Sequence, residues 1–575
     1  MVRGRILPAL VVTAVVLMLP AAASAHAYLV KTFPVASAVL NTPPPDVALT
    51  FDEAVEPRFA IISVTDVNAH SETTGPVHRS AADPDTLVVP LRHLAEGWYL
   101  VVWRAISVDG HPVGSAFTFA VGPNEGPIPQ FTIPDLSATA TTTPLLVTRW
   151  AVFLTTMIAI GLFILRLLIA RPLVRRVEGA SLRPVSVAFS IAAALGLLAT
   201  PVYLEVATAN DSLRSAFDVG TLVPLFRTTA FGRGYVDLEI CFALFCFAAG
   251  VAIWLDRPER GRRSIAAILS AAGALAAAAA VLVIPGTSGH AAQTAPQALS
   301  LLLDWLHLVS GSIWLGGLIG LLVLWGSLTA GRRVAGLSVV VPRFSAVAFL
   351  SVLLLLGSGT WATVLHMPVL AALWQTGYGK VILIKIGLLV AAMGLAAVNL
   401  LRTKPHLVAA AEQPGLGEPA ARLLRRMIGG ETVVVAGAVF AAALLSSLPP
   451  PPPAFALEGA ALKRVGPGRI STAVNQAGYK LQLLVEPNRA AAPNSFSVTL
   501  TRNGQPVSGA DVRLSFDMLD MQMPNQLYQL AETRPGTYTR STSALVMVGH
   551  WGLAFTVIPK SGSPFSALIV DHATG

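Results

Sequence analysis

Charged residues are few in this chain of 575 residues: Asp, Glu, Lys and Arg make up 12% of it, whereas 54% is hydrophobic. The mean hydropathy is +0.65. A soluble protein of this length does not need so many apolar residues to fill its cores. The composition therefore excludes a soluble globular protein and indicates a protein that crosses a membrane several times.

Cysteines and enzyme motifs are also scarce. The two cysteines, Cys241 and Cys246, lie in one apolar run, so they provide neither a disulfide framework nor a Cys-x-x-Cys metal site. The sequence has no phosphate-binding loop and no recognisable set of nucleophile and base. We therefore expect that the protein is not an enzyme and that it does not use ATP.

Residues 1–25 have the pattern of a secretory signal peptide. Two arginines precede an apolar core, and Ala23-Ser24-Ala25 is a typical cleavage site. Cleavage there would make His26 the first residue of the mature chain. Its α-amine and its imidazole would then lie together outside the cytoplasm.

Eight apolar stretches within residues 144–449 are long enough to cross a bilayer, which takes about 20 residues each. They lie near residues 145–170, 184–206, 234–255, 264–285, 298–328, 342–366, 379–400 and 430–449. The loops on one side of these stretches carry 16 Lys and Arg residues, and the loops on the other side carry three. Because basic loops stay in the cytoplasm, both ends of the mature chain are predicted to be extracytoplasmic. The net charge of +9 then reflects membrane topology rather than a nucleic acid partner.

Two segments that flank the apolar stretches are predicted to be β domains. Short alternating runs between Pro, Gly, Asn and Asp turns occupy residues 26–121 and 471–575, and Asn503-Gly504 predicts a hairpin turn. Residues 122–143 and the proline-rich residues 450–470 have the composition of linkers. The predicted fold class is therefore a polytopic α-helical membrane protein with eight transmembrane helices, flanked by two extracytoplasmic all-β domains of Ig-like sandwich or barrel type.

Ionisable residues in the fifth apolar stretch identify a candidate site in the membrane. Asp304 and His307 lie three residues apart, on one face of a helix, and an ionisable group inside a bilayer is by default functional. Ser312, Gly316 and Gly320 form a ladder of small residues that lets another helix come close. The alternative, that Asp304 and His307 contact headgroups or a loop at the interface, stays open.

The N-terminal β domain holds a candidate copper site. Asp109 and His111 lie two residues apart, so in an extended segment both side chains leave on one face. With the amine and imidazole of His26 they would supply three nitrogens and one oxygen, a set that suits Cu(II); Zn(II) would accept it but prefers a tetrahedron. Cu(I) is expected to bind poorly, because no methionine lies between His26 and Gly122. A surface loop without metal is the alternative.

The C-terminal β domain holds a candidate Cu(I) site. Met521 and Met523 alternate by two, so in a strand they point the same way, and thioethers select Cu(I). His550 would complete the site. Core methionines and a turn histidine are the alternatives.

Three stretches of the N-terminal domain, HAYLVKTFPV, LTFDEAVEP and SVDGHPVGSAFTFAV, make it similar to the CopC family of periplasmic copper-binding proteins. In that family the N-terminal His and the Asp and His of the D-G-H motif bind Cu(II), which implies His26, Asp109 and His111 as ligands. The membrane segment resembles the CopD family in SGHAAQ at 288–293, in LHLVSGSIWLGGL and in the long run at 376–402. CopC joined to CopD in one chain is the architecture of YcnJ-type copper transport proteins. The C-terminal domain resembles the YtkA-like modules.

This resemblance implies that copper is bound outside the cytoplasm and transferred to or across the cytoplasmic membrane, in copper homeostasis or resistance. A metal that enters from outside would first meet a set of polar groups at the outer edge: His290, Asp304, His307 and His366. Two alternatives remain: sequestration or sensing without transport, and a membrane haem protein or metalloreductase with His307 and His366 as ligands. We expect copper ions and the lipid bilayer as partners, and we leave an extracytoplasmic copper donor, the direction of transport and the oligomeric state open.

Overall fold

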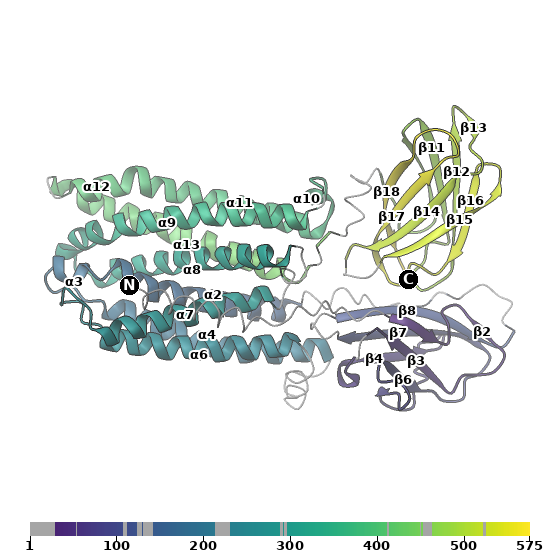
Figure 1. Ribbon diagram of the computed structural model, residues 1–575, viewed down its shortest axis with the longest axis horizontal. Coiled ribbons are helices and arrows are strands. Elements are labelled where there is room, and N and C mark those ends of the chain that lie inside the picture. The colour runs from purple at the N-terminus through teal and green to yellow at the C-terminus, as the bar shows by residue number, and fades with distance from the viewer. Residues whose placement is uncertain are drawn as a thin grey trace, which may run out of the picture.

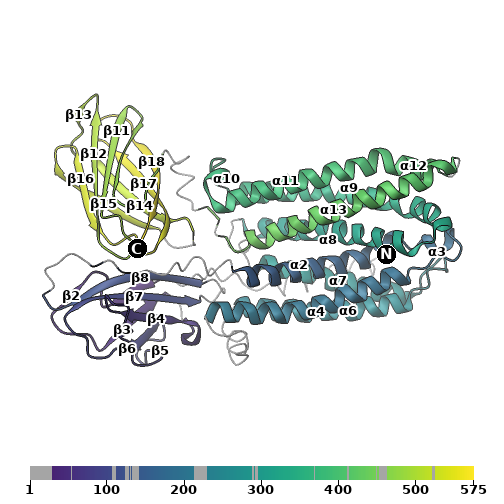
Figure 2. The same cartoon turned by 180° about the vertical axis from the view of Figure 1, so that it is seen from behind.

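The computed structural model has a long helical bundle with two β domains at one of its ends (Figures 1 and 2). The residues that the structure describes are 29–52, 55–106, 112–123, 129, 131, 142–212, 230–287, 291, 296–367, 369–410, 413–448, 450–451, 463–520 and 525–575. Because both β domains are at one end, the expectation that they lie on the same side of the membrane agrees with the architecture.

Eight helices in the described part of the chain are long and apolar enough to cross a membrane, which confirms the predicted number. They are α2 (Thr143–Ile164), α4 (Arg183–Ser212), α6 (Ala230–Leu255), α7 (Ile265–Thr287), α8 (Gln297–Ser327), α9 (Ala330–His366), α11 (Gly377–Val398) and α13 (Gly417–Leu445). Shorter helical pieces are η1 (Pro57–Phe59), η3 (Leu165–Ile169), α3 (Leu173–Arg176), α10 (Ala372–Gln375), η6 (Asn399–Thr403), α12 (Lys404–Ala409) and η7 (Pro414–Leu416).

Two helices begin earlier than the sequence predicted. Helix α9 begins at Ala330 rather than near 342, since it continues through Pro342, and prolines are tolerated in membrane helices. Helix α13 begins at Gly417 rather than near 430. Its first turns are amphipathic, with Ala421 and Leu424 buried and Arg422 and Arg425 on other faces. Both basic segments had been taken for loops, although their arginines do lie at the predicted end of the bundle.

The centre of the bundle is the pair α2 and α8, which are the most buried of the eight helices. The two backbones meet at Gly161 and Gly316, where a Cβ atom on Gly316 would lie 2.5 Å from the Cα of Gly161. Gly320 packs against the side chain of Leu165 in the same seam. The ladder of small residues in α8 therefore permits the close helix contact that the sequence predicted, because only glycine leaves room for the two backbones to approach this closely.

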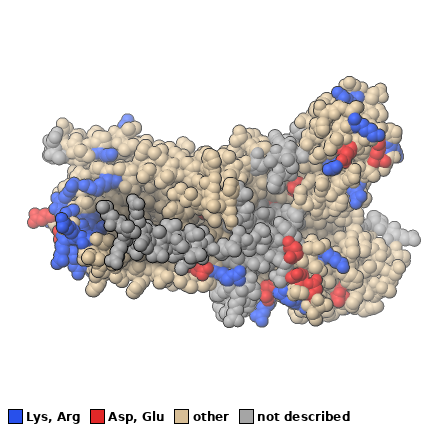
Figure 3. Space-filling view, viewed as in Figure 1, with Lys and Arg blue, Asp and Glu red and all other residues tan. Residues whose placement is uncertain are grey.

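Basic side chains gather at the end of the bundle that is far from the β domains (Figure 3). The carboxylate of Asp256 is buried there, and its oxygens lie 3.0 Å from Arg166 Nη1 and 3.2 Å from Arg171 Nε. Two further guanidinium groups, those of Arg333 and Arg425, lie over the ring of Trp325 at 4.2 and 4.5 Å. Arginine side chains are therefore concentrated at this end of the bundle.

The N-terminal β domain is a sandwich of two four-stranded sheets, ordered β1-β3-β6-β5 and β2-β8-β7-β4. Its core fills the space between the sheets, where the rings of Phe51 and Trp103 meet edge to face at 5.4 Å. The strands are β1 (Leu29–Phe33), β2 (Val39–Leu40), β3 (Asp46–Phe51), β4 (Ile61–Thr65), β5 (His78–Arg79), β6 (Thr86–Pro90), β7 (Gly97–Ile106) and β8 (Pro112–Val121).

The C-terminal β domain is a single ten-stranded sheet that curls until β10 contacts β18. Asn503 and Gly504 have φ of 52° and 79° in the turn between β12 and β13, so the predicted hairpin turn is confirmed. The strands are β9 (Lys463–Arg464), β10 (Ile470–Gln476), β11 (Tyr479–Glu486), β12 (Asn494–Arg502), β13 (Gln505–Pro506), β14 (Asp511–Met518), β15 (Gln526–Arg534), β16 (Thr537–Thr542), β17 (Gly549–Ile558) and β18 (Phe565–Ala573).

The two β domains contact each other along strand β8. The backbone N–H of Ala116 donates to the carbonyl oxygen of Val546 at 3.0 Å, and the hydroxyl of Thr118 donates to the carbonyl oxygen of Ala491 at 3.0 Å. Leu100, Ala116, Phe131 and Ala491 form a small apolar cluster in the same interface. The first and last domains of the chain therefore pack side by side.

Candidate functional site

The predicted Cu(II) ligands His26, Asp109 and His111 lie outside the described residues. The strands that lead to them are described: β1 begins at Leu29, β7 ends at Ile106 and β8 begins at Pro112. Leu29 pairs with Phe51, and the ring of Phe51 contacts that of Trp103, three residues before the end of β7. The chain therefore approaches both halves of the predicted ligand set from the same end of the sandwich.

That end of the sandwich contacts the helical bundle. Arg104 Nη1, two residues before the end of β7, donates to the carbonyl oxygen of Asn210 in α4 at 3.1 Å. The side chain of Asn210 is itself held by the hydroxyl of Thr142, at 3.1 Å, just before α2. The short helix η1 also contacts α4. The end of the domain that carries the D-G-H motif is thus the one that faces the membrane helices.

His307 lies inside the bundle, where side chains from three helices meet. Its Nδ1 atom is 3.1 Å from the hydroxyl oxygen of Ser358 in α9, and its Nε2 atom is 3.3 Å from Nζ of Lys385 in α11. The hydroxyl of Ser358 donates to the carbonyl oxygen of Leu354 at 2.6 Å, so Nδ1–H of His307 donates to Ser358. The lone pair of the imidazole is then on Nε2, toward Lys385.

Asp304 lies one turn before His307 on α8, about 10 Å along the helix from its start at Gln297. A Cβ atom on Gly286 of α7 would lie 2.8 Å from its Oδ2 atom, so the glycine lets α7 pass close to the carboxylate. Asp304 also interacts electrostatically with Lys385. The structure therefore brings Asp304, His307 and Lys385 together between helices.

The partners of His307 were not found from the sequence. The sequence analysis connected neither Lys385 nor Ser358 with His307. The available signal was a lysine in the middle of an apolar run, which is as unusual as the aspartate and histidine of α8. Which helices face each other is a tertiary property, so sequence spacing did not connect the two.

His366 lies at the end of α9, with Nδ1 2.7 Å from the carbonyl oxygen of Ala362. It is eight residues from Ser358, which corresponds to about 12 Å along the helix. A haem with two axial histidines needs imidazoles at matching depths. His307 and His366 differ in depth by two turns, so this geometry does not favour a haem between them. His290 lies outside the described residues.

In the C-terminal domain, Met521 and Met523 lie outside the described residues, but His550 is described. Its Nδ1 atom is 2.9 Å from Oδ2 of Asp520, and this carboxylate raises the pKa of the imidazole. His572 pairs directly with His550 across β17 and β18, and the two rings stack with centroids 4.7 Å apart. His572 was missed, since only the strand register brings it beside His550.

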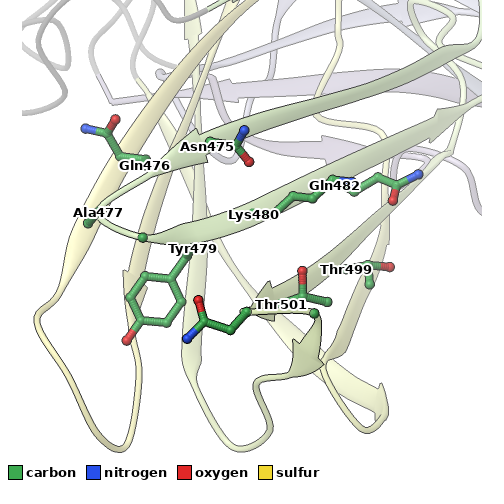
Figure 4. A pocket seen from close by; sticks show the side chains of 11 residues that line it. Asn475, Gln476, Ala477, Tyr479, Lys480, Gln482, Thr499 and Thr501 are labelled. Atoms are coloured by element: carbon green, nitrogen blue, oxygen red, sulfur yellow. The ribbon is translucent and has the colours of Figure 1, made fainter.

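No group of three or more His, Cys, Asp or Glu residues is arranged to hold an ion in the described part of the chain. A polar pocket lies on the hairpins of β10, β11 and β12 (Figure 4). Its side chains include Tyr479, Lys480 and Gln482, and its lining has no imidazole, thiol, thioether or carboxylate. It therefore does not suit a copper ion.

Comparisons with known proteins match both β domains and much of the helical bundle. Family models match the chain in four places: the CopC domain at residues 29–122, the copper resistance protein D-like N-terminal domain at 139–298, copper resistance protein D at 338–445 and the YtkA-like family at 473–556. The copper transport protein CutJ of Bacillus subtilis (strain 168) is 28% identical over 394 residues, which cover 67% of this chain and 70% of that protein. Protein YobA of Escherichia coli (strain K12) is 37% identical over 98 residues, which cover 17% of this chain and 79% of that protein.

Among solved structures, the crystal structure of CopC from Methylosinus trichosporium OB3b is similar, with 33% sequence identity and a TM-score of 0.16. The match covers 18% of this chain and 98% of that one.

Proposed function

We propose that the chain binds copper outside the cytoplasm and transfers it to or across the cytoplasmic membrane; in support, CopC, CopD and YtkA-like family models match its successive domains, and it is similar to a copper transport protein over 67% of its length. The metal is the cargo of this process. The proposed receiving site is in the N-terminal domain, where His26, Asp109 and His111 hold Cu(II). No chemical conversion by the protein is part of the proposal.

The observation that carries the proposal is the contact between the ligand-bearing end of the sandwich and the helices. Arg104 bonds to Asn210 two residues before β7 ends, and the D-G-H motif follows that end directly. A metal released there starts its path at the outer end of α2 and α4. A domain that only sequesters copper would have no need to turn its binding end toward the bundle.

The next ligand on the proposed path is His307. Its Nε2 atom carries the lone pair, and Asp304 one turn earlier supplies negative charge for a cation. The ammonium of Lys385 is 3.3 Å from Nε2, so an arriving copper ion displaces it from this position. His290 and His366 belong to the same proposed path, at the edge from which the metal enters.

The C-terminal domain is proposed to take part as a second copper site. Met521 and Met523 would supply thioethers for Cu(I), and His550 an imidazole. In support, His550 and its partner Asp520 lie directly beside the segment that carries the methionines, and apolar contacts of this domain with residues 367–372 dock it on the bundle. Copper bound there would be close to the same end of the helices.

The side of the membrane is also part of the proposal. The arginines around Asp256 and Trp325 gather at the end of the bundle opposite the β domains (Figure 3), which favours a cytoplasmic location for that end and an extracytoplasmic one for both domains. A reporter that is active only in the cytoplasm, fused after Gly575, should be inactive. An active fusion would overturn this orientation.

The test of the proposed function is copper accumulation by cells that express the full chain, together with Cu(II) titration of the purified protein. Asp109→Ala and His111→Ala should lower both the copper accumulation of the cells and the Cu(II) affinity of the purified protein. His78→Ala is the matched control, since His78 lies in the same domain with an exposed side chain on β5 and should change neither. Normal Cu(II) binding without any effect of the protein on cellular copper would favour sequestration or sensing instead.

A further inference from the structure

Glu431 is a buried acidic residue that the proposed path has not yet used. It is the middle residue of α13, which runs from Gly417 to Leu445, and only 2% of its surface is exposed. It therefore lies halfway along its helix, unlike Asp304, which is two turns from the start of its helix. A carboxyl group buried among apolar helices is costly and calls for a function.

Two neutral side chains lie beside the carboxyl group of Glu431. The indole Nε1–H of Trp314 in α8 donates to Oε1 at 2.7 Å, and the amide side chain of Asn399 in η6 is the second neighbour. Neither partner carries a charge, and no ion pair to Glu431 is found in the described part of the chain. A carboxylate in this surrounding needs a cation to neutralise it, which is either a proton or a metal ion.

Charged and titratable groups on the neighbouring helices keep apart from Glu431. The charged and titratable side chains within these helices are Arg149 on α2, Asp304 and His307 on α8, Arg343 on α9, Lys385 on α11 and Arg402 on η6. The remaining charged and titratable side chains lie at the ends of α9, α11 and α12. Among the described contacts none of them bonds to Glu431: Arg149, for example, bonds to Tyr203 at 3.0 Å and Lys385 to His307.

Polar groups lead from His307 to Glu431 along one face of α8. Ser310 and Trp314 follow His307 at three and seven residues, which is about 10 Å along the helix. Ser310 is 1% exposed, and its hydroxyl oxygen has no hydrogen-bond partner among the described residues. A buried hydroxyl group without a protein partner is rare, and it provides a place for water or a hydrated cation.

The same pattern continues beyond Glu431 in η6. Asn399 Oδ1 and Thr403 Oγ1 are buried and also lack hydrogen-bond partners in the described part of the chain. Both residues belong to a π-helical turn, and such turns often occur at functional sites. Polar groups thus extend from the outer cluster through Glu431 toward the basic end of the bundle.

We propose that Glu431 is the proton-carrying carboxyl group that couples proton movement to the movement of copper. The proton leaves Oε2 for water on this polar path, the electron pair stays on the carboxylate, and a proton from water restores the acid; no electron is transferred. The donor set favours a proton over copper, since two carboxyl oxygens and one amide oxygen are poor ligands for a soft metal ion. This inference rests on the proposed transport function and identifies its coupling ion.

The test uses the full chain in vesicles that contain a pH-sensitive dye. Glu431→Gln keeps the shape and the acceptor for Trp314 but cannot bind a proton, and Glu431→Asp keeps the acid. Glu418→Gln is the matched control, because Glu418 lies on the same helix with 43% of its side chain exposed. We expect proton movement on copper addition to fall about 10-fold or more in Glu431→Gln, to recover partly in Glu431→Asp and to stay unchanged in the control.

A second measurement separates this inference from the proposed function. Infrared difference spectra on copper addition should contain a carboxylic C=O band that is absent in Glu431→Gln and present in Glu418→Gln. Cu(II) binding by the N-terminal domain should be unaffected in both. An identical band and identical proton movement in Glu431→Gln would overturn the role of Glu431, whereas wild-type vesicles that take up no copper would overturn the transport function itself.

Discussion

The two β domains lie at the same end of the bundle but are attached to it by different interactions. The N-terminal domain contacts the helices through a polar bond, from Arg104 to Asn210, and through η1. The C-terminal domain rests on an apolar cluster in which Leu568 and Val570 of β18 pack against Ala372. Arg464 of this domain also bonds to the carbonyl oxygen of Gln375.

The difference concerns how readily each domain separates from the helices. Parting the apolar contact exposes buried surface to water, whereas the bond between Arg104 and Asn210 can be exchanged for bonds to water at a net cost of about 1–2 kcal/mol. Toward the helices, the domain proposed to receive copper from outside therefore has the more exchangeable contacts. It is also held by the C-terminal domain, where its strand β8 bonds to Val546 and Ala491.

The largest expected effect is on the Cu(II) site of the N-terminal domain. An extra glycine before His26 removes the primary amine as a ligand and shifts the imidazole, so Cu(II) affinity should fall by about 100-fold or more. Met521→Leu in the C-terminal domain should leave Cu(II) affinity unchanged. A competition titration of the two mature proteins measures this, and equal affinities for the extended and authentic chains would remove the proposed ligand set.

The next effect is on the docking of the C-terminal domain. Leu568→Asp places an unpaired charge in the buried contact with the bundle, which costs about 3 kcal/mol, or roughly 100-fold in the undocked population. Trypsin should then cleave after Arg464 much faster. Leu527→Asp is the control, because Leu527 is 62% exposed on the same domain. Equal cleavage rates in the two variants would contradict an apolar dock.

A smaller effect is expected when the polar contact of the N-terminal domain is removed. Arg104→Met deletes the bond to Asn210 and should weaken the contact between the N-terminal domain and α4 by about 1–2 kcal/mol. Copper accumulation should fall several-fold while Cu(II) affinity stays normal. Arg92→Met, which removes a surface ion pair with Glu72 in the same domain, should change neither. A loss of Cu(II) affinity in Arg104→Met would mean that this residue supports the site and not the contact.

The smallest effect concerns His550. Asp520 raises the pKa of His550 in the folded protein. The ion pair therefore stabilises the domain fully at pH values below the pKa of an unfolded histidine, about 6.5. This stabilisation is lost as the pH rises through the pKa of His550 in the folded protein. Asp520→Asn should lower the pKa of His550 and reduce stability only at low pH, by less than about 1 kcal/mol because the pair is half exposed. NMR titration of the imidazole measures the shift, and an unchanged pKa would contradict it.

The sequence predicted those features that depend on local pattern. The length of the apolar stretches was sufficient to predict the eight helices, and Asn503-Gly504 was sufficient to predict a hairpin turn. Both features depend on residues that are neighbours in the sequence. The small residues of α8 predicted a close helix contact, although not that Gly161 of α2 would be the partner. The motif of the N-terminal domain was likewise recognisable, and its ligand set stays a prediction.

The features that depend on how helices turn toward each other were not predictable in this way. Lys385 and His307 are 78 residues apart, and only the rotation of α8 and α11 brings Nζ to Nε2. Glu431 was not singled out from the sequence, where it falls at the start of the stretch predicted near 430–449. The helix begins at Gly417, 13 residues earlier, so the carboxyl group lies halfway along it.

The pairing of β8 with the C-terminal domain has a consequence for the order in which the protein matures. Ala116 leaves the ribosome roughly 430 residues before Val546, its hydrogen-bond partner. At about 5–20 residues per second this interval lasts roughly 20 to 90 seconds, during which all eight helices are inserted. The N-terminal domain must therefore fold and persist without its neighbour while the chain is still being made. A nascent or truncated chain would expose that side of β8 to the outside, and only the completed protein covers it.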